Sequence, residues 1–218
     1  MRVVLGLDAG IAQTNQLSRT VTFPLGYSTF NYTPDKKNSS FARYGVSLGR
    51  RLVFDSLNSI IIGLGYHQLS SRDVKGTLQQ GIFPPFYSAN YQYTIQMSQL
   101  LAEVKVQREW HEKFYPYLTA GIGGAYNKAK NFSTTVPGYL TVTPDFSNHN
   151  NSSLSYMLGL GIDTLILPNV AVGVGYVFSD LGHVGLGDGS IRNRAVPDYL
   201  NQSHLYINTL VAQLHWYF

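Results

Sequence analysis

The sequence predicts an all-β fold in which eight antiparallel strands close into a single barrel. Three observations predict it. Large apolar residues alternate with small or polar ones, with a period of two, in eight separate segments. Short and long connections between these segments alternate along the chain. Aromatic and charged residues each make up 13% of the chain, and for charged residues this is about half the usual share.

The first four strands are expected at Val3–Ile11, Tyr44–Leu48, Ile60–His67 and Thr94–Trp110. In the third of them, large apolar side chains would share one face, while Gly63, Gly65 and His67 would share the other. In the fourth, apolar residues alternate with charged and amide residues from Leu100 onwards. Each of these segments therefore predicts a strand with two chemically different faces.

The last four strands are expected at Tyr117–Tyr126, Tyr156–Asp163, Val170–Phe178 and Leu205–Phe218. The final strand carries the clearest alternation. One of its faces is apolar over five positions, which are Leu210, Ala212, Leu214, Trp216 and Phe218. The opposite face mixes apolar and polar groups and should place His215 and Tyr217 inside the barrel.

The connections between the strands are predicted to be of two kinds. Short turns are expected at 54–58, 111–113 and 167–169. Long polar loops are expected near 14–40, 71–90, 131–152 and 180–203. These loops are rich in Asn, Ser, Thr, Gly and Pro, which favour turns and irregular backbone.

The two faces of the strands favour a membrane barrel over a water-soluble one. The larger apolar residues form one face, and the other is dominated by Gly, Ala and Ser with isolated charges. Small residues suit the narrow interior of an eight-stranded barrel, and the apolar face suits lipid. No apolar run is long enough for a membrane-spanning helix, which needs about 20 residues. We therefore interpret residues 1–218 as one domain, an up-and-down transmembrane β-barrel.

Two segments resemble a known family. The alternating tail from Leu210 to Phe218 is similar to the C-terminal signature of Gram-negative outer-membrane proteins. Tyr115–Tyr126 resembles the Gly-rich strand of small opacity-type surface proteins, which group with the OmpA transmembrane domain and OmpX. The resemblance implies a bacterial outer-membrane location and a tail that is read by the barrel assembly machinery, with Leu210, Ala212, Leu214, Trp216 and Phe218 as the assembly signature.

The expected orientation places both termini and the three short turns in the periplasm and the four long loops outside the cell. The expected function is that of a non-enzymatic surface protein, acting through its loops in adhesion, host interaction or envelope integrity. The alternative is a narrow channel or a carrier of small or hydrophobic molecules. We expect no cofactor. The net charge of +4 is scattered, which argues against a nucleic-acid partner.

Seven charged residues are expected to face the interior. Because buried charges need partners, we expect them to pair and fill the lumen, and the alternative is an ion pathway. The expected lumen charge network consists of Asp8, Arg43, Arg51, Glu103, Lys105, Glu109 and Asp163.

Candidate catalytic and metal sites are weak. Ser147 with His149, and Ser203 with His204, are the nearest serine–histidine pairs. Asp145 with His149 is a candidate protease dyad, but no second acidic pair accompanies it. All lie in predicted loops, so we interpret them as polar loop residues. The chain has no cysteine, and its histidines are dispersed. We therefore expect neither a catalytic nor a metal site.

Six basic residues are expected near the bases of the long loops, at the level of lipopolysaccharide phosphates. They are candidate lipopolysaccharide contacts because Arg and Lys pair well with phosphate. The alternative is ordinary solvated loop charge. These residues are Arg72, Lys75, Lys128, Lys130, Arg192 and Arg194. The apolar loop tip at 82–87 is a further candidate for partner contact, or for local packing.

Overall fold

In the computed structural model, eight long strands form a closed antiparallel ring. The structure describes residues 2–14, 19–25, 28–35, 39–81, 88–111, 113–136, 143–191, 194–196 and 200–218. The eight strands are β1 (Arg2–Thr14), β4 (Ser39–Val53), β5 (Asn58–Gln80), β6 (Ser88–Arg108), β7 (Phe114–Thr135), β9 (His149–Leu167), β10 (Val170–Asp180) and β15 (Tyr206–Tyr217). Each strand pairs with its neighbours in the chain, and β1 pairs with β15 to close the ring. The predicted fold class and all eight predicted strands are confirmed.

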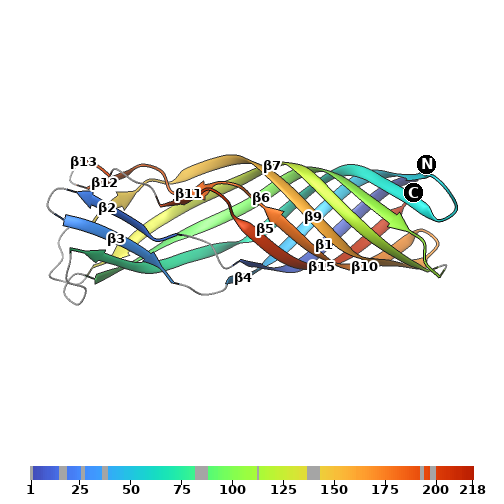
Figure 1. The fold of residues 1–218 in the computed structure, drawn as a ribbon, viewed down its shortest axis with the longest axis horizontal. Coiled ribbons are helices and arrows are strands. Elements are labelled where there is room, and N and C mark those ends of the chain that lie inside the picture. The colour runs from blue at the N-terminus through green and yellow to red at the C-terminus, as the bar shows by residue number, and fades with distance from the viewer. Residues whose placement is uncertain are drawn as a thin grey trace.

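Among the described residues, seven shorter strands lie between the long ones. They are β2 (Val21–Leu25), β3 (Ser28–Pro34), β8 (Asp145–Phe146), β11 (Val184–Gly185), β12 (Gly189–Ile191), β13 (Arg194–Ala195) and β14 (Asn201–Gln202). Figure 1 shows an elongated molecule with both termini at one end and β2, β3, β12 and β13 at the other. We call these the turn end and the loop end. No helix among the described residues is long and apolar enough to cross a membrane.

The three short connections are confirmed, and side-chain hydrogen bonds hold one of them. In the turn after β4, the carboxylate Oδ1 of Asp55 accepts the backbone N–H groups of Leu57 and Asn58 at 2.8 and 2.7 Å. The Asn58 side-chain amide also donates to this carboxylate. Hydrogen bonds from the Asn58 side chain and from these two N–H groups lower the pKa of Asp55, because they stabilise its charged form.

The predicted long loops are only partly irregular. The expectation of irregular backbone at 71–90 and 131–152 is wrong over most of their described residues, because β5 continues to Gln80, β6 begins at Ser88, β7 continues to Thr135 and β9 begins at His149. The predicted loop at 14–40 contains the β2–β3 hairpin, and β3 pairs with the far end of β5. The barrel wall therefore extends well beyond the segments that the sequence predicts. The loop tip at 82–87 lies outside the described residues.

Two β-bulges explain why the alternation of faces predicted strands that are shorter than the observed ones. The β5–β6 register shifts between Leu69 and Arg72, and the β6–β7 register shifts where Gln92 and Thr94 face β7. In β7 the shift coincides with Asn131, whose φ is 58°. A bulge adds one residue to a strand, so the alternation of faces changes phase across it. In β5 the buried positions change from odd numbers, such as Leu69, to even numbers, such as Val74.

The outer face of the ring is apolar in a band between two sets of aromatic residues. Toward the loop end, one exposed tyrosine lies on each of six strands, at positions 44, 66, 126, 156, 176 and 206. Toward the turn end lie the exposed aromatic residues Phe54, Trp110, Phe114, Trp216 and Phe218. Tyr206 and Trp216 are separated by ten residues in β15, which corresponds to about 25 Å in a tilted strand. The band has the height and the aromatic borders of a lipid-facing wall.

The interior is divided into a polar half and an apolar half. Toward the loop end, buried residues of β2, β3, β5, β6, β8 and β15 form one apolar core with the segment after β10. Its centre is aromatic: the rings of Tyr32 and Tyr91 lie 5.2 Å apart, and those of Phe132 and Phe146 lie 5.1 Å apart. Burial raises the pKa of the Tyr32 phenol, with smaller contributions from Tyr91 and Asp145. The sequence predicted a lumen of small and charged residues, and this is wrong for the loop-end half.

The position of the lipid band can be tested with two outward-facing leucines of β9. Leu160 lies inside the band and is 57% exposed, whereas Leu154 lies on the loop-end side of Tyr156. We expect Leu160→Arg to lower the free energy of unfolding in lipid bilayers by about 2–4 kcal/mol, because it places a charge in hydrocarbon. Leu154→Arg should cost about 0–1 kcal/mol. Equal costs in denaturant titrations would contradict this placement.

Candidate functional site

Four neighbouring strands place charged side chains together in the turn-end half of the interior. Asp8 of β1 lies 3.0 Å from Arg43 of β4, measured between Oδ1 and Nη1. His67 of β5 lies between two carboxylates, with Nδ1 3.2 Å from Asp8 Oδ2 and Nε2 2.6 Å from Oε1 of Glu103 in β6. The imidazolium form carries an N–H group on each nitrogen and a positive charge, so it is the form that suits both carboxylates.

Glycines give these side chains room to lie against the wall. A Cβ atom at Gly45 would lie 2.1 Å from His67 Nδ1 and 2.3 Å from Asp8 Oδ2. A Cβ atom at Gly65 would lie 2.2 Å from Glu103 Oε1. The alternation of glycine with large residues therefore creates the space that the charged side chains occupy.

A second polar group lies beside the first and shares strand β6 with it. Lys105 Nζ lies 2.7 Å from Asp163 Oδ2 and donates to Gln213 Oε1 at 3.1 Å. The same Asp163 oxygen accepts a hydrogen bond from Gln107 Nε2 at 2.6 Å and lies 3.6 Å from Nδ1 of His215. Sequence reasoning missed His67 and His215 as members of the network, although both lie at inward positions of their strands.

Residues of both groups line a cavity of about 60 Å³, which we call the polar chamber. Its lining includes Asp8, Arg43, His67, Glu103, Lys105 and His215. Its volume and its polar wall suit a small number of ordered water molecules.

Arg51 and Glu109 lie apart from the other five charged residues, toward the turn end. The Arg51 guanidinium lies 5.7 Å from the ring centre of Tyr115 and 5.3 Å from that of Tyr217. Glu109 accepts a hydrogen bond from the Tyr115 hydroxyl at 3.3 Å. Both tyrosines are buried, so this cluster narrows the interior below the polar chamber.

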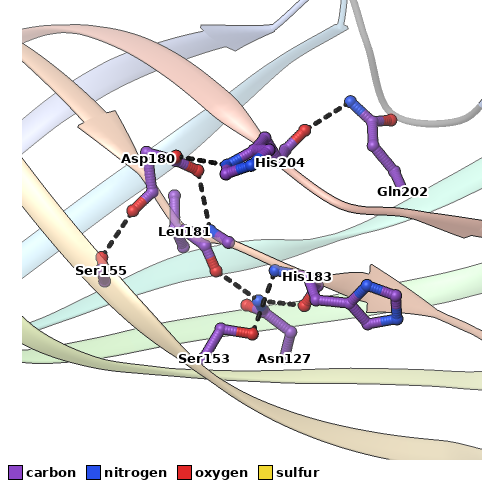
Figure 2. A network of polar contacts seen from close by, with 9 residues as sticks. Asn127, Ser153, Ser155, Asp180, Leu181, His183, Gln202 and His204 are labelled. Carbon is purple, nitrogen blue, oxygen red and sulfur yellow. Dashed lines mark hydrogen bonds and ion pairs between the residues drawn. The ribbon is translucent and has the colours of Figure 1, made fainter.

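At the loop end, the chain turns inward after β10 and passes across the barrel interior. The inward segment comprises residues 181–187, and all of it is buried except His183, which is half-buried. Asn127 of β7 donates hydrogen bonds to the carbonyl oxygens of Leu181 and His183 at 2.8 and 2.9 Å, as Figure 2 shows. The backbone N–H of His183 donates to Ser153 Oγ of β9 at 3.0 Å. The inward segment is therefore held by side chains of the wall.

Asp180, at the end of β10, binds both the inward segment and the residue that leads into β15. Its Oδ1 accepts the Gly182 N–H at 2.8 Å, and its Oδ2 lies 2.8 Å from Nδ1 of His204, just before β15 (Figure 2). Its carbonyl oxygen accepts a hydrogen bond from Ser155 Oγ at 2.7 Å. Gly182 has a positive φ of 64°, which favours glycine. No pattern in the sequence predicts this contact, because Asp180 and His204 lie on opposite sides of a long connection.

The described residues of 143–148 and 181–205 meet at the loop end, and we call them the cap. The Gly187 N–H donates to the Ser147 carbonyl at 2.9 Å, and β12 pairs with β8 and β13. The inward segment pairs with β14 through Val184 and Gly185. Backbone pairing therefore joins two distant connections at the loop end.

The candidate catalytic residues do not form a nucleophile–base pair. Ser147 and Ser203 donate no hydrogen bond to a histidine ring, and His204 is bound to Asp180. Burial and the nearby His149 lower the pKa of His183. In the part of the chain that the structure describes, no three His, Asp or Glu side chains are grouped to hold a metal ion.

Of the six predicted basic contacts, two are neighbours on β7, and the other described ones lie elsewhere. Lys128 and Lys130 lie on the outer face of β7, and Lys75 is exposed on β5. Arg72 pairs with the buried Ile95, so it points to the inner side of the wall. Arg194 lies in the cap, and Arg192 lies outside the described residues.

The pair Lys105–Asp163 allows a test of the polar chamber. We expect Lys105→Met to lower the free energy of unfolding by about 3–5 kcal/mol, because it leaves a buried carboxylate without its counter-ion. Adding Asp163→Asn should restore much of the loss. Denaturant titrations followed by tryptophan fluorescence would measure this, with Lys113→Met in an exposed turn as the control. A single variant as stable as the control would contradict it.

Several solved structures are similar to this chain at low sequence identity. Neisserial surface protein A is 11% identical over 100% of this chain and 97% of its own, with a TM-score of 0.49. The outer membrane protease OmpT from Escherichia coli is 9% identical over 100% and 95%, with a TM-score of 0.49. Ail, the attachment invasion locus protein of Yersinia pestis, is 15% identical over 100% of both chains, with a TM-score of 0.38.

At these identities and TM-scores the likenesses say nothing about what this chain binds. No match was found among curated protein sequences. The family described as "Outer membrane protein beta-barrel domain" matches residues 3–218. The match covers nearly the whole chain and agrees with the closed ring and its apolar outer band. The chain therefore belongs to the outer membrane protein β-barrel family of bacteria.

Proposed function

We propose that this protein is a closed, non-enzymatic barrel that presents its cap to partners outside the cell. The observation that carries the proposal is the apolar core in the loop-end half. Leu78, Ile95, Leu181 and Leu205 are almost fully buried there, in the space that a channel would need to leave open. An interior packed in this way supports a structural role for the wall and a contact role for the cap.

The proposed orientation places the loop end outside and both termini in the periplasm. The connections at the turn end are short, and those at the loop end are long. Outer-membrane barrels typically have short periplasmic turns and longer external loops. In this orientation the tyrosines at the loop-end border of the band lie at the outer surface of the membrane.

The cap suits a contact role because its backbone is held before any partner arrives. The wall residues Asn127 and Asn151 donate to carbonyl groups of the inward segment, and the cap strands pair with one another. Ordering the cap at the moment of binding would therefore cost little conformational entropy. Its exposed residues include Asn148, Asp188, Ser190 and Arg194. Adhesion, host contact and envelope integrity are the roles that such a surface supports.

A single glycine tests the role of the cap. A Cβ atom at Gly185 would lie 2.4 Å from the Asn201 Cβ and 2.9 Å from the Leu200 carbonyl oxygen, so Gly185→Ala should displace the inward segment. We expect cells that display this variant to adhere several-fold less to epithelial cells and matrix proteins than cells that display the wild type. Limited proteolysis should show a cleaved cap on an intact barrel.

The matched control is Gly124→Ala, because a Cβ atom at Gly124 would meet no atom closer than 3.7 Å. This variant should behave as the wild type does. If the cap of Gly185→Ala is cleaved and adhesion is unchanged, the proposal that the cap makes the contact is wrong.

A further inference from the structure

Two lysines on the outer face of β7 lie next to each other without an acidic partner. Lys128 faces Gln96 of β6 on one side and Asn150 of β9 on the other, and Lys130 faces Thr94 of β6. Alternate residues of a strand share a face and lie about 6.6 Å apart. The two ammonium groups can therefore reach one ligand from the same side.

The positive charge of this pair is not offset nearby. No carboxylate of the described residues lies within 4 Å of either ammonium group, and neither lysine makes a further polar contact with the part of the chain that is described. The nearest carboxylate along the row is Asp73 of β5, which pairs with Thr94 and accepts its hydroxyl at 2.8 Å. Asp73 is two strands away from Lys130, or roughly 9–10 Å between backbones.

Tyr126 indicates where Lys128 and Lys130 lie along the membrane normal. This exposed tyrosine precedes Lys128 by two residues on the same face and belongs to the aromatic border at the loop end. Such borders lie at the level of the lipid headgroups. The ammonium groups of Lys128 and Lys130, one and two steps further toward the loop end, reach the layer in which lipid phosphates lie.

We propose that Lys128 and Lys130 form a binding site for a phosphate group of an outer-leaflet lipid. Two ammonium groups pair with a phosphate dianion, and the neutral side chains of Gln96 and Asn150 flank the first lysine as further hydrogen-bond donors. The assignment to the outer leaflet rests on the proposed orientation, whereas the pairing of the two lysines with a phosphate does not depend on it.

The proposed site includes only two of the basic residues that were predicted to contact lipopolysaccharide. Arg72 points to the inner side of the wall, and its Nε is buried. Arg194 lies in the cap, away from the aromatic border. Lys75 pairs with Gln92, beyond both bulges and further from the band. Only the β7 lysines combine outward direction, a nearby partner lysine and the height of the border among the described candidates.

The test measures lipid binding to the purified, folded barrel in neutral detergent. Native mass spectrometry would compare lipid A carrying both phosphates, lipid A from which both have been removed, and inorganic phosphate. We expect the double variant Lys128→Gln and Lys130→Gln to bind phosphorylated lipid A at least about tenfold more weakly than the wild type, which corresponds to the loss of one charge-assisted contact or more. The double variant with arginine at both positions should retain binding.

Lys75→Gln with Lys113→Gln is the matched control, because it removes the same charge elsewhere and should leave binding unchanged. If the Lys128→Gln and Lys130→Gln double variant binds phosphorylated lipid A as tightly as the wild type does, the proposed site is wrong. Equal binding of the dephosphorylated lipid would show that acyl chains alone are recognised and would overturn it too. If inorganic phosphate displaces the lipid at comparable concentration, the site binds free phosphate, and its assignment to a lipid is wrong.

The orientation is tested separately. The chain has no cysteine, so Ser133→Cys, exposed on β7, can be labelled without background. Labelling by a membrane-impermeant maleimide on intact cells supports the outer leaflet. Labelling only after permeabilisation would overturn the orientation, and lipid binding in detergent would not change.

Discussion

The pairing of β1 with β15 is the interaction on which the rest of the structure depends. It joins the first and last strands over ten residue pairs, from Val4 with Tyr217 to Gln13 with Asn208. Without it the wall would have two open edges in a solvent that cannot hydrogen-bond to them. Closure fixes the number of strands in the ring, and with it the narrow interior that every inward side chain must share.

The interior has a polar half and an apolar half because the outer face of the wall meets lipid in one part and water in the other. Within the lipid band the wall must be apolar outside, so polar groups and glycines face inward and pair with one another around the polar chamber. Beyond the aromatic border the outer face meets water, and the pattern reverses. Lys75 and Lys128 point outward there, while Val74 and Tyr91 pack inside. The two β-bulges in β5 and β7 lie at this transition.

The sequence alone predicted the ring, the facing of the final strand and five of the charged residues that meet inside. It did so because a period of two assigns a face to each residue wherever a strand is regular. It failed where a bulge changes the phase, as at Asn131, and the strands beyond were interpreted as loops. It also could not pair Asp180 with His204, since that contact depends on how two distant connections meet. Arg51 was assigned to the network, but its guanidinium lies against the rings of Tyr115 and Tyr217, and its Nε donates to Ser59 Oγ at 3.1 Å.

The central claim is the proposal that the side chains packed at the loop end leave no continuous aqueous path through the described part of the barrel. Single-channel recording of the purified barrel in planar lipid bilayers tests this most directly, with a general porin as the positive control. The structure predicts no reproducible openings, because the apolar core and the cluster of Arg51 with its two tyrosines lie above and below a chamber of about 60 Å³. Reproducible openings with a defined conductance from folded, heat-modifiable protein would contradict the account.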